Sequence, residues 1–202
     1  MNFSKEEIRD LTKAWLAISV AVAVAFLGRT VESLTLVVLV RGAVIYGLTV
    51  GVAFLAHEVF GHKLTAQRFG IFAEFRADDF FLLLALVFAF FTGFVFAAPG
   101  AVVIGGVTRV DTYGKIAAAG PLVNIFLAIL FLFLARSGIS LILPLVDSQG
   151  IDLVSTSFQI NAWLALFNLL PLGILDGAKV LAWNKGIWAT LGVASLILLF
   201  GF

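Results

Sequence analysis

Long apolar segments constrain this chain more than any other feature of its sequence. Residues 80–98 contain nineteen residues without a charge, and five other apolar runs recur along the chain. A transmembrane helix needs about 20 predominantly apolar residues, and the alternating pattern of a membrane β-barrel is absent. Only 12% of the residues are charged, whereas about a quarter are charged in soluble domains. The sequence therefore predicts an all-α polytopic membrane protein.

The apolar runs predict a helical bundle of about five spans plus one re-entrant segment. The predicted spans are residues 14–28, 34–61, 116–135, 154–172 and 187–202. With a cytoplasmic N-terminus and a re-entrant segment at 80–98, ten Lys and Arg residues lie inside and three outside. If that segment crosses instead, the division is seven to six. Cytoplasmic loops are enriched in Lys and Arg, so we expect residues 80–98 to dip and return.

Two shorter patterns complete the expected secondary structure. Residues 1–13 predict an amphipathic helix, opened by a capping box in which Glu7 reaches back to Ser4. This helix could lie at the membrane interface or could be a solvated N-terminal helix. After the re-entrant segment, residues 101–104 and 107–110 are rich in β-branched side chains and flank a Gly-Gly pair. This pattern predicts a short β-hairpin.

Both histidines of the chain lie in the stretch Ala56-His57-Glu58-Val59-Phe60-Gly61-His62-Lys63, at the end of an apolar run. Titratable side chains at membrane depth are costly and therefore indicate a functional site. The chain has no cysteine, so any metal must be held by histidine and carboxylate. Two histidines and one carboxylate form a common set for catalytic zinc, and a glutamate beside the first histidine is the usual base. Asp176, beside an apolar span, is the candidate third ligand.

Simpler explanations exist for each of these residues. Glu58 could be a helix-face glutamate that pairs with Lys63 or an arginine. Asp176 could be a turn aspartate that precedes Gly177. The two histidines could be one satisfied core side chain and one solvated side chain at a helix end.

Several motifs occur together, in order, between residues 43 and 185. They are His57-Glu58 with His62 to Gly70, Ala97 to Ala101, Ala119 to Asn124, Asn168 to Pro171, and Leu175 to Lys179. Together they resemble the archaeal members of the site-2 protease family, the intramembrane zinc metalloproteases. The resemblance implies that His57, His62 and Asp176 bind Zn²⁺ and that Glu58 activates the water. It also implies that Asn124 holds the substrate or the oxyanion; a hydrogen bond from Asn124 to a neighbouring helix is the alternative.

The same resemblance implies an enzyme that cleaves the transmembrane segments of other membrane proteins, with the lipid bilayer as its surroundings. Residues 101–110 would correspond to a membrane-dipping strand region, where an unwound substrate could add as a strand. We expect one membrane-embedded domain over residues 1–202, in which 1–42 hold the interfacial helix and first span, 43–185 the family core, and 186–202 the final span. The active site would face the cytoplasm.

Other classes of function are weighed against this one. A catalytically inactive relative that binds client proteins without cutting them is the main alternative. A metal transporter ranks last, because few polar residues lie in the other spans to line a path. The net charge of +1 argues against a nucleic-acid partner.

The spacing of the two histidines departs from the family pattern His-Glu-x-x-His. In a regular α-helix, residues i and i+4 are about 40° apart around the axis, whereas i and i+5 are about 140° apart. His57 and His62 are five residues apart, so one extra residue must be absorbed. A π-bulge, an early helix end or a degraded site would each account for it. An altered ligand set of Glu58, His62 and Asp176 is a further possibility.

Overall fold

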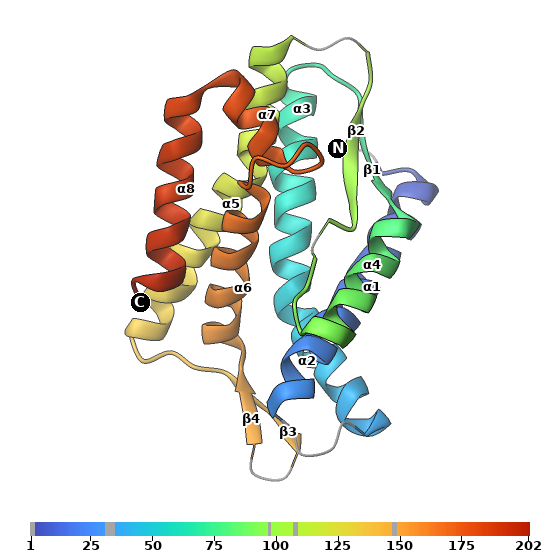
Figure 1. Ribbon diagram of the computed structural model, residues 1–202, viewed down its shortest axis with the longest axis vertical. Coiled ribbons are helices and arrows are strands. Elements are labelled where there is room, and N and C mark those ends of the chain that lie inside the picture. Colours follow the sequence, from blue (N-terminus) through green and yellow to red (C-terminus); the bar gives the residue numbers. More distant parts are fainter. Residues whose placement is uncertain (1–2, 31–34, 97, 107–108, 147–148) are drawn as a thin grey trace.

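The computed structural model describes residues 3–30, 35–96, 98–106, 109–146 and 149–202 of the 202-residue chain. Helix α1 (Lys5–Thr30) leads to a continuous central helix that consists of α2 (Leu36–Leu55), η1 (Ala56–Lys63) and α3 (Leu64–Arg68). Helices α5 (Val110–Arg136), α6 (Leu153–Asn168) and α8 (Lys185–Phe200) lie on one side of this central helix. Helices α1 and α4 (Asp79–Thr92) lie on the other side (Figure 1).

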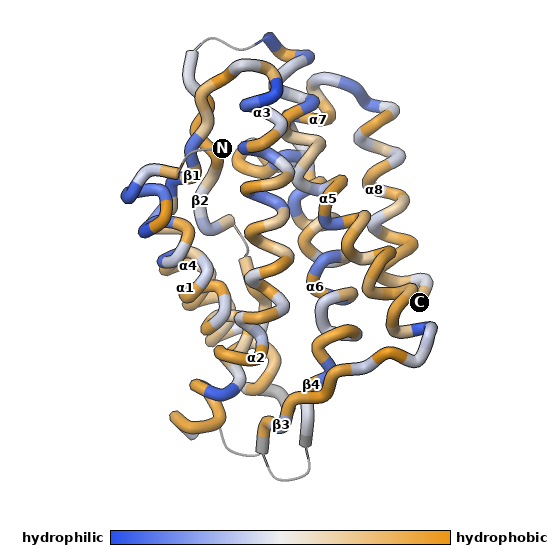
Figure 2. Tube along the Cα trace, turned by 180° about the vertical axis from the view of Figure 1, so that it is seen from behind, coloured by the Kyte–Doolittle hydropathy of each residue, from blue (hydrophilic) through white to orange (hydrophobic). Residues whose placement is uncertain are grey.

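Three helical stretches of the described chain are long and apolar enough to cross a membrane. They are Lys5–Gly28, Leu36–Arg68 and Val110–Arg136. The expected count of five spans is therefore met only in part, since α6 and α8 have 16 residues each. At 1.5 Å per residue these two helices are about 24 Å long, which is short of a hydrocarbon core of about 30 Å. Figure 2 shows apolar residues along most of the length of the helices.

The first helix runs without a break from the predicted interfacial segment into the predicted first span. It packs against α2 through glycines that admit a tryptophan. Trp15 Nε1 donates to the carbonyl of Gly47 at 2.8 Å, and a Cβ on Gly51 would lie 2.8 Å from the same nitrogen. Small residues let membrane helices approach closely, so these glycines fix how α1 lies on α2.

The apolar segment 80–98 doubles back on itself. It lies between strands β1 (Ala73–Ala77) and β2 (Gly100–Ile104), which pair antiparallel with Ala77 opposite Gly100. The residues before and after the segment are therefore neighbours in one sheet. Between them, α4 packs along α1 before the chain returns to the sheet (Figure 1). The segment does not run from one end of the molecule to the other.

The predicted hairpin at 101–110 is wrong, because its first strand forms but pairs with a different partner. Strand β2 forms as expected, but it pairs with β1, and Val110 already begins α5; residues 107–108 lie outside the described residues. Strand β1 lies in a charged stretch of the sequence, yet its side chains alternate, with Ala73 and Phe75 buried. A second antiparallel pair forms between β3 (Ile142–Val146) and β4 (Gln149–Asp152).

Candidate metal centre

The extra residue between the histidines is absorbed by a π-helix. The central helix changes from α to π geometry over Ala56–Lys63 and returns to α geometry at Leu64. In π geometry residues i and i+5 lie on one side of the helix. The rings of His57 and His62 consequently lie 4.6 Å apart, centroid to centroid, and nearly perpendicular at 85°. The structure thus shows the π-helical solution to the spacing, and the helix does not end early.

Two glycines allow this segment to reach helix α5. A Cβ on Gly61 would lie 2.6 Å from the Cα of Gly120, so the two backbones touch. A Cβ on Gly120 would lie 2.5 Å from His62 Cε1 and 2.6 Å from His57 Nε2. The missing side chain of Gly120 thus leaves room for both imidazole rings.

Asp176 joins the two histidines from a distant part of the chain. It is the first residue of helix α7 (Asp176–Trp183), which begins close to the C-terminal end of α6. Its Oδ2 lies 3.2 Å from His57 Nε2 and 3.0 Å from His62 Nε2, and the two Nε2 atoms are 3.0 Å apart. A Cβ on Gly177 would lie 2.1 Å from the carbonyl oxygen of Leu169, so glycine there permits the close approach.

Hydrogen bonds behind the rings fix which nitrogens face the cluster. Asn124 Nδ2 donates to the carbonyl of Ala53 at 3.0 Å and to Asn161 Oδ1 at 2.9 Å. Asn124 Oδ1 must therefore accept, and it lies 2.5 Å from His57 Nδ1. His62 Nδ1 lies 2.9 Å from the carbonyl of Ile116, which also can only accept. Both Nδ1 atoms are thus donors, and both neutral rings turn an Nε2 lone pair toward Asp176.

The donor set fits a metal ion. The two Nε2 atoms and Asp176 Oδ2 lie 3.0–3.2 Å from one another. In the tautomers described above, all three atoms are acceptors. Tetrahedral zinc with bonds of about 2.0–2.1 Å separates neighbouring ligand atoms by about 3.3 Å. All three residues are buried, and among the described residues no other such group of three or more His, Cys, Asp or Glu side chains is close enough to hold a metal.

The charge of Asp176 suits a ligand. Lys179 Nζ lies 3.4 Å from Asp176 Oδ1, and this ion pair favours the carboxylate form of Asp176. Asp176 also lies at the start of a helix, where the helix dipole favours a negative group. The carboxylate is therefore ionised and available as an acceptor. The view of Asp176 as a simple turn residue does not account for its two histidine neighbours.

Glu58 lies beside this cluster but is not part of it. Its Oε2 is buried and has no hydrogen-bond partner within the described chain. Lys63, the partner considered from sequence, forms a buried ion pair with Glu7 instead. The three residues whose ligand atoms converge are His57, His62 and Asp176, so the altered set with Glu58 is not the one that the structure assembles.

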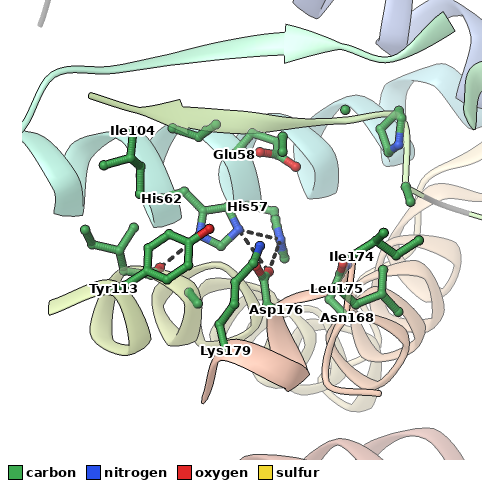
Figure 3. A pocket seen from close by; sticks show the side chains of 17 residues that line it. His57, Glu58, His62, Ile104, Tyr113, Asn168, Ile174, Leu175, Asp176 and Lys179 are labelled. Carbon is green, nitrogen blue, oxygen red and sulfur yellow. Dashed lines mark hydrogen bonds and ion pairs between the residues drawn. The ribbon is translucent and has the colours of Figure 1, made fainter. Parts of the chain in front are cut away.

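The cluster opens into a cavity of about 50 Å³ (Figure 3). Strand β2 forms one wall with Gly100, Ala101, Val102 and Ile104, and Tyr113 and Lys179 lie opposite. Glu58 lines the same cavity, as do His57, His62 and Asp176. The arrangement places a carboxylate, a metal-binding triangle and a strand around one small volume.

Asn124 lies elsewhere than expected for a substrate contact. Its side chain is fully buried, it does not line the cavity, and both of its N–H groups are already used. The alternative from the sequence, a bond to neighbouring helices, describes it better. Asn161 and the carbonyl of Ile116 were not predicted. A polar side chain inside an apolar span indicates a functional or structural role, so the sequence could have pointed to Asn161. A backbone carbonyl cannot be identified from residue type.

Comparison with known proteins gives one informative relative. No protein-family profile matches the chain, and no solved structure matches it. The protein named "Putative zinc metalloprotease MJ0611", from Methanocaldococcus jannaschii, is 38% identical over 196 residues, which cover 95% of this chain and 92% of the relative. The buried His57–His62–Asp176 group fits the Zn²⁺ that this name implies. The chain therefore belongs to the zinc metalloprotease family that this relative represents.

Proposed function

We propose that this protein is an intramembrane zinc endopeptidase of the site-2 protease type, which cuts the transmembrane segments of other membrane proteins. The observation that carries the proposal is Glu58 Oε2, which is buried and unpartnered among the described residues while lining one cavity with the three candidate ligands. An unpaired buried carboxylate costs free energy, so its retention beside a metal-binding group favours a chemical role.

Each residue has a defined part in the reaction. His57 Nε2, His62 Nε2 and Asp176 Oδ2 would hold the zinc ion. When bound, zinc supplies Lewis-acid polarisation of a water molecule and of the scissile carbonyl. Glu58 Oε2 takes a proton from the water as its oxygen forms a bond to the carbonyl carbon. Glu58 then returns the proton to the amide nitrogen as the C–N bond breaks.

The substrate would be presented as a strand. A peptide bond within a helix is shielded by its own hydrogen bonds, so a transmembrane substrate must unwind before water can attack it. One edge of β2 pairs with β1, and in the described part of the chain the other edge has no partner strand. Because β2 lines the cavity, a strand added to that edge would bring its carbonyls toward Glu58.

The surroundings of the site support cleavage over the alternative functions. A protein that only binds clients has no need of an unpartnered buried carboxylate beside a metal-binding group. A metal transporter needs a polar path, whereas the cavity at the cluster holds only about 50 Å³. We place the active site toward the cytoplasm on the distribution of Lys and Arg residues.

The test uses purified protein in lipid vesicles with a model transmembrane substrate. We expect one zinc per chain and cleavage that falls by about 10²–10⁴-fold in Glu58→Gln, which is the range for loss of a general base. Zinc content should stay unchanged in that variant. Glu6→Gln, an exposed glutamate of α1, serves as the matched control. Absence of stoichiometric zinc, or cleavage by Glu58→Gln at the wild-type rate, would overturn the proposal.

A further inference from the structure

Hydrolysis of a peptide bond creates a negative charge that needs a partner. As water adds to the carbonyl, the oxygen of that carbonyl becomes an oxyanion, and a preorganised donor aimed at it lowers the barrier. Asn124 cannot serve, because its side chain is buried behind His57 with both N–H groups used. Asn168, on the cavity wall, uses one N–H of Nδ2 to donate to the carbonyl of Leu164 at 3.1 Å, and its amide carries no charge. A different side chain must supply the charge.

Lys179 is placed to do so. Among the described residues that line the cavity it is the one Lys or Arg, and Figure 3 shows its amine turned toward His57 and Asp176. It lies three residues after Asp176 on α7, on the same helical face. Its Nζ is 3.4 Å from Asp176 Oδ1, the carboxylate oxygen that does not face the histidines.

The Lys179 ammonium group is positioned by two contacts and still has N–H donors available. The ring of Tyr113, from α5, lies beneath Nζ with its centroid 5.7 Å away, and the Lys179 side chain is 22% exposed. A contact of 3.4 Å is at the long end for a charged hydrogen bond, so Nζ retains donors that can turn into the cavity. The ring and Asp176 Oδ1 fix where those donors lie.

We propose that Lys179 is a catalytic residue whose ammonium group stabilises the oxyanion formed from the scissile carbonyl. The inference rests on the proposed protease function and extends it. The water oxygen bonds to the carbonyl carbon, Glu58 takes its proton, and the π electrons of the carbonyl move onto its oxygen. Nζ–H donates to that oxygen until the C–N bond breaks and the carbonyl re-forms.

The charges around the cavity make this assignment consistent. Glu58 and Asp176 are both acidic groups on the cavity wall; once Glu58 has taken the proton of the water, Asp176 and the oxyanion are the two negative groups there. In a site that excludes water such repulsion is poorly screened. A single ammonium group on the same wall opposes it and acts most strongly when the oxyanion is present.

The experiment compares Lys179→Met with Lys185→Met. Methionine keeps the length of the side chain and removes the charge; Lys185 is an exposed lysine at the start of α8. We expect Lys179→Met to lower kcat by about 10²–10³-fold, the range for loss of one oxyanion donor, with KM within about twofold. Zinc binding, titrated on the apo protein, should be unchanged. Lys185→Met should match wild type, and Lys179→Arg should recover part of the rate.

A second measurement does not require turnover. A peptidyl phosphonate carries an anionic tetrahedral group that resembles the transition state. We expect Lys179→Met to bind it about 100-fold more weakly than wild type, while a neutral peptide of the same sequence binds equally to both.

Three results would overturn the inference. They are kcat or phosphonate binding of Lys179→Met near wild type, loss of zinc from that variant, or a loss in Tyr113→Phe that Lys179→Met does not share. If wild type itself neither cleaves nor differs from Glu58→Gln, the proposed function fails, which is a distinct outcome. In that case the oxyanion role of Lys179 fails with the proposed function.

Discussion

Asn124 shows how a single amide can orient a candidate metal ligand. It accepts from His57 Nδ1, and its own N–H groups reach the carbonyl of Ala53 and the side chain of Asn161. Asn161 in turn donates to the carbonyl of Ser157 at 2.8 Å. This chain of amides holds the ring of His57 with Nε2 toward the cluster. A hydrogen bond of this kind to the remote nitrogen sets both the tautomer and the orientation of a histidine ligand.

We therefore expect Asn124→Leu to lose zinc affinity by about 10–100-fold. Leucine has a similar volume but cannot accept from Nδ1, so the ring of His57 can turn and change tautomer. Zinc affinity is measured by competition with a chelator, with Gln159→Leu, an exposed amide on α6, as the control. If Asn124→Leu binds zinc as tightly as the control but binds substrate weakly, Asn124 is a substrate contact after all.

The residues of the site differ in how visible they are in the sequence. Titratable side chains beside apolar spans stand out, which is why Glu58, His57, His62 and Asp176 could be named in advance as one group. The sequence cannot tell on which side of His57 an asparagine will lie, so Asn124 was placed with the substrate. Gly120 appeared only as one of several small residues, although its missing side chain is the space for both rings.

The π-helix is the element on which the site depends. An insertion of one residue in an α-helix would point His57 and His62 apart, but the insertion is confined to Ala56–Lys63 and the helix continues at Leu64 in α geometry. The sequence offered this as one of three outcomes because local propensity does not distinguish them. Tertiary contacts select the π form. Gly61 lies against Gly120, and His62 Nδ1 donates a hydrogen bond to the carbonyl of Ile116.

Three elements meet at a second buried polar group. Glu7 of α1 receives a backbone N–H from Phe75 of β1 at 3.0 Å and pairs with Lys63 at the end of η1. The predicted capping box formed only in half. Ser4 Oγ accepts from the N–H of Glu7 at 3.1 Å, but the Glu7 carboxylate turns inward. The sequence does not predict these contacts of Glu7, because Lys63 and Phe75 lie 56 and 68 residues away along the chain.

Removal of Glu7 should destabilise the fold. Glu7→Ala leaves Lys63 as a buried charge without its carboxylate, and breaking a buried pair in this way costs about 3–5 kcal/mol. Glu6→Ala, at a neighbouring exposed position, should change stability by less than about 0.5 kcal/mol. The free energy of unfolding in detergent gives both values. Adding Lys63→Met to Glu7→Ala should restore part of the loss, and a Glu7→Ala protein as stable as wild type would show that the pair contributes little.

At the scale of the whole molecule, composition predicts a membrane protein, and three described helices are long and apolar enough to span a membrane. Composition was not enough to predict which segments traverse the structure. Residues 80–98 are as apolar as the three helices that are long enough to cross a membrane, and only the pairing of Ala77 with Gly100 shows that both ends of the segment meet. That pairing joins the strands before and after the segment. The periodicity of apolar residues predicts helices and strands but not which strands pair with each other.

The orientation that follows from this fold can be tested with single cysteines, because the chain has none of its own. Phe69→Cys and Gly186→Cys lie at exposed positions near the end that holds α3 and α7, and Ser137→Cys lies exposed at the end of α5. With residues 80–98 doubling back, an impermeant maleimide should label Ser137→Cys in intact cells, whereas the other two should label only after permeabilisation. If residues 80–98 crossed the membrane, Phe69→Cys and Ser137→Cys would label alike and Gly186→Cys would differ from both. Labelling of Phe69→Cys and Gly186→Cys from outside, with Ser137→Cys protected, would keep the fold and reverse its orientation, which would place the metal centre away from the cytoplasm.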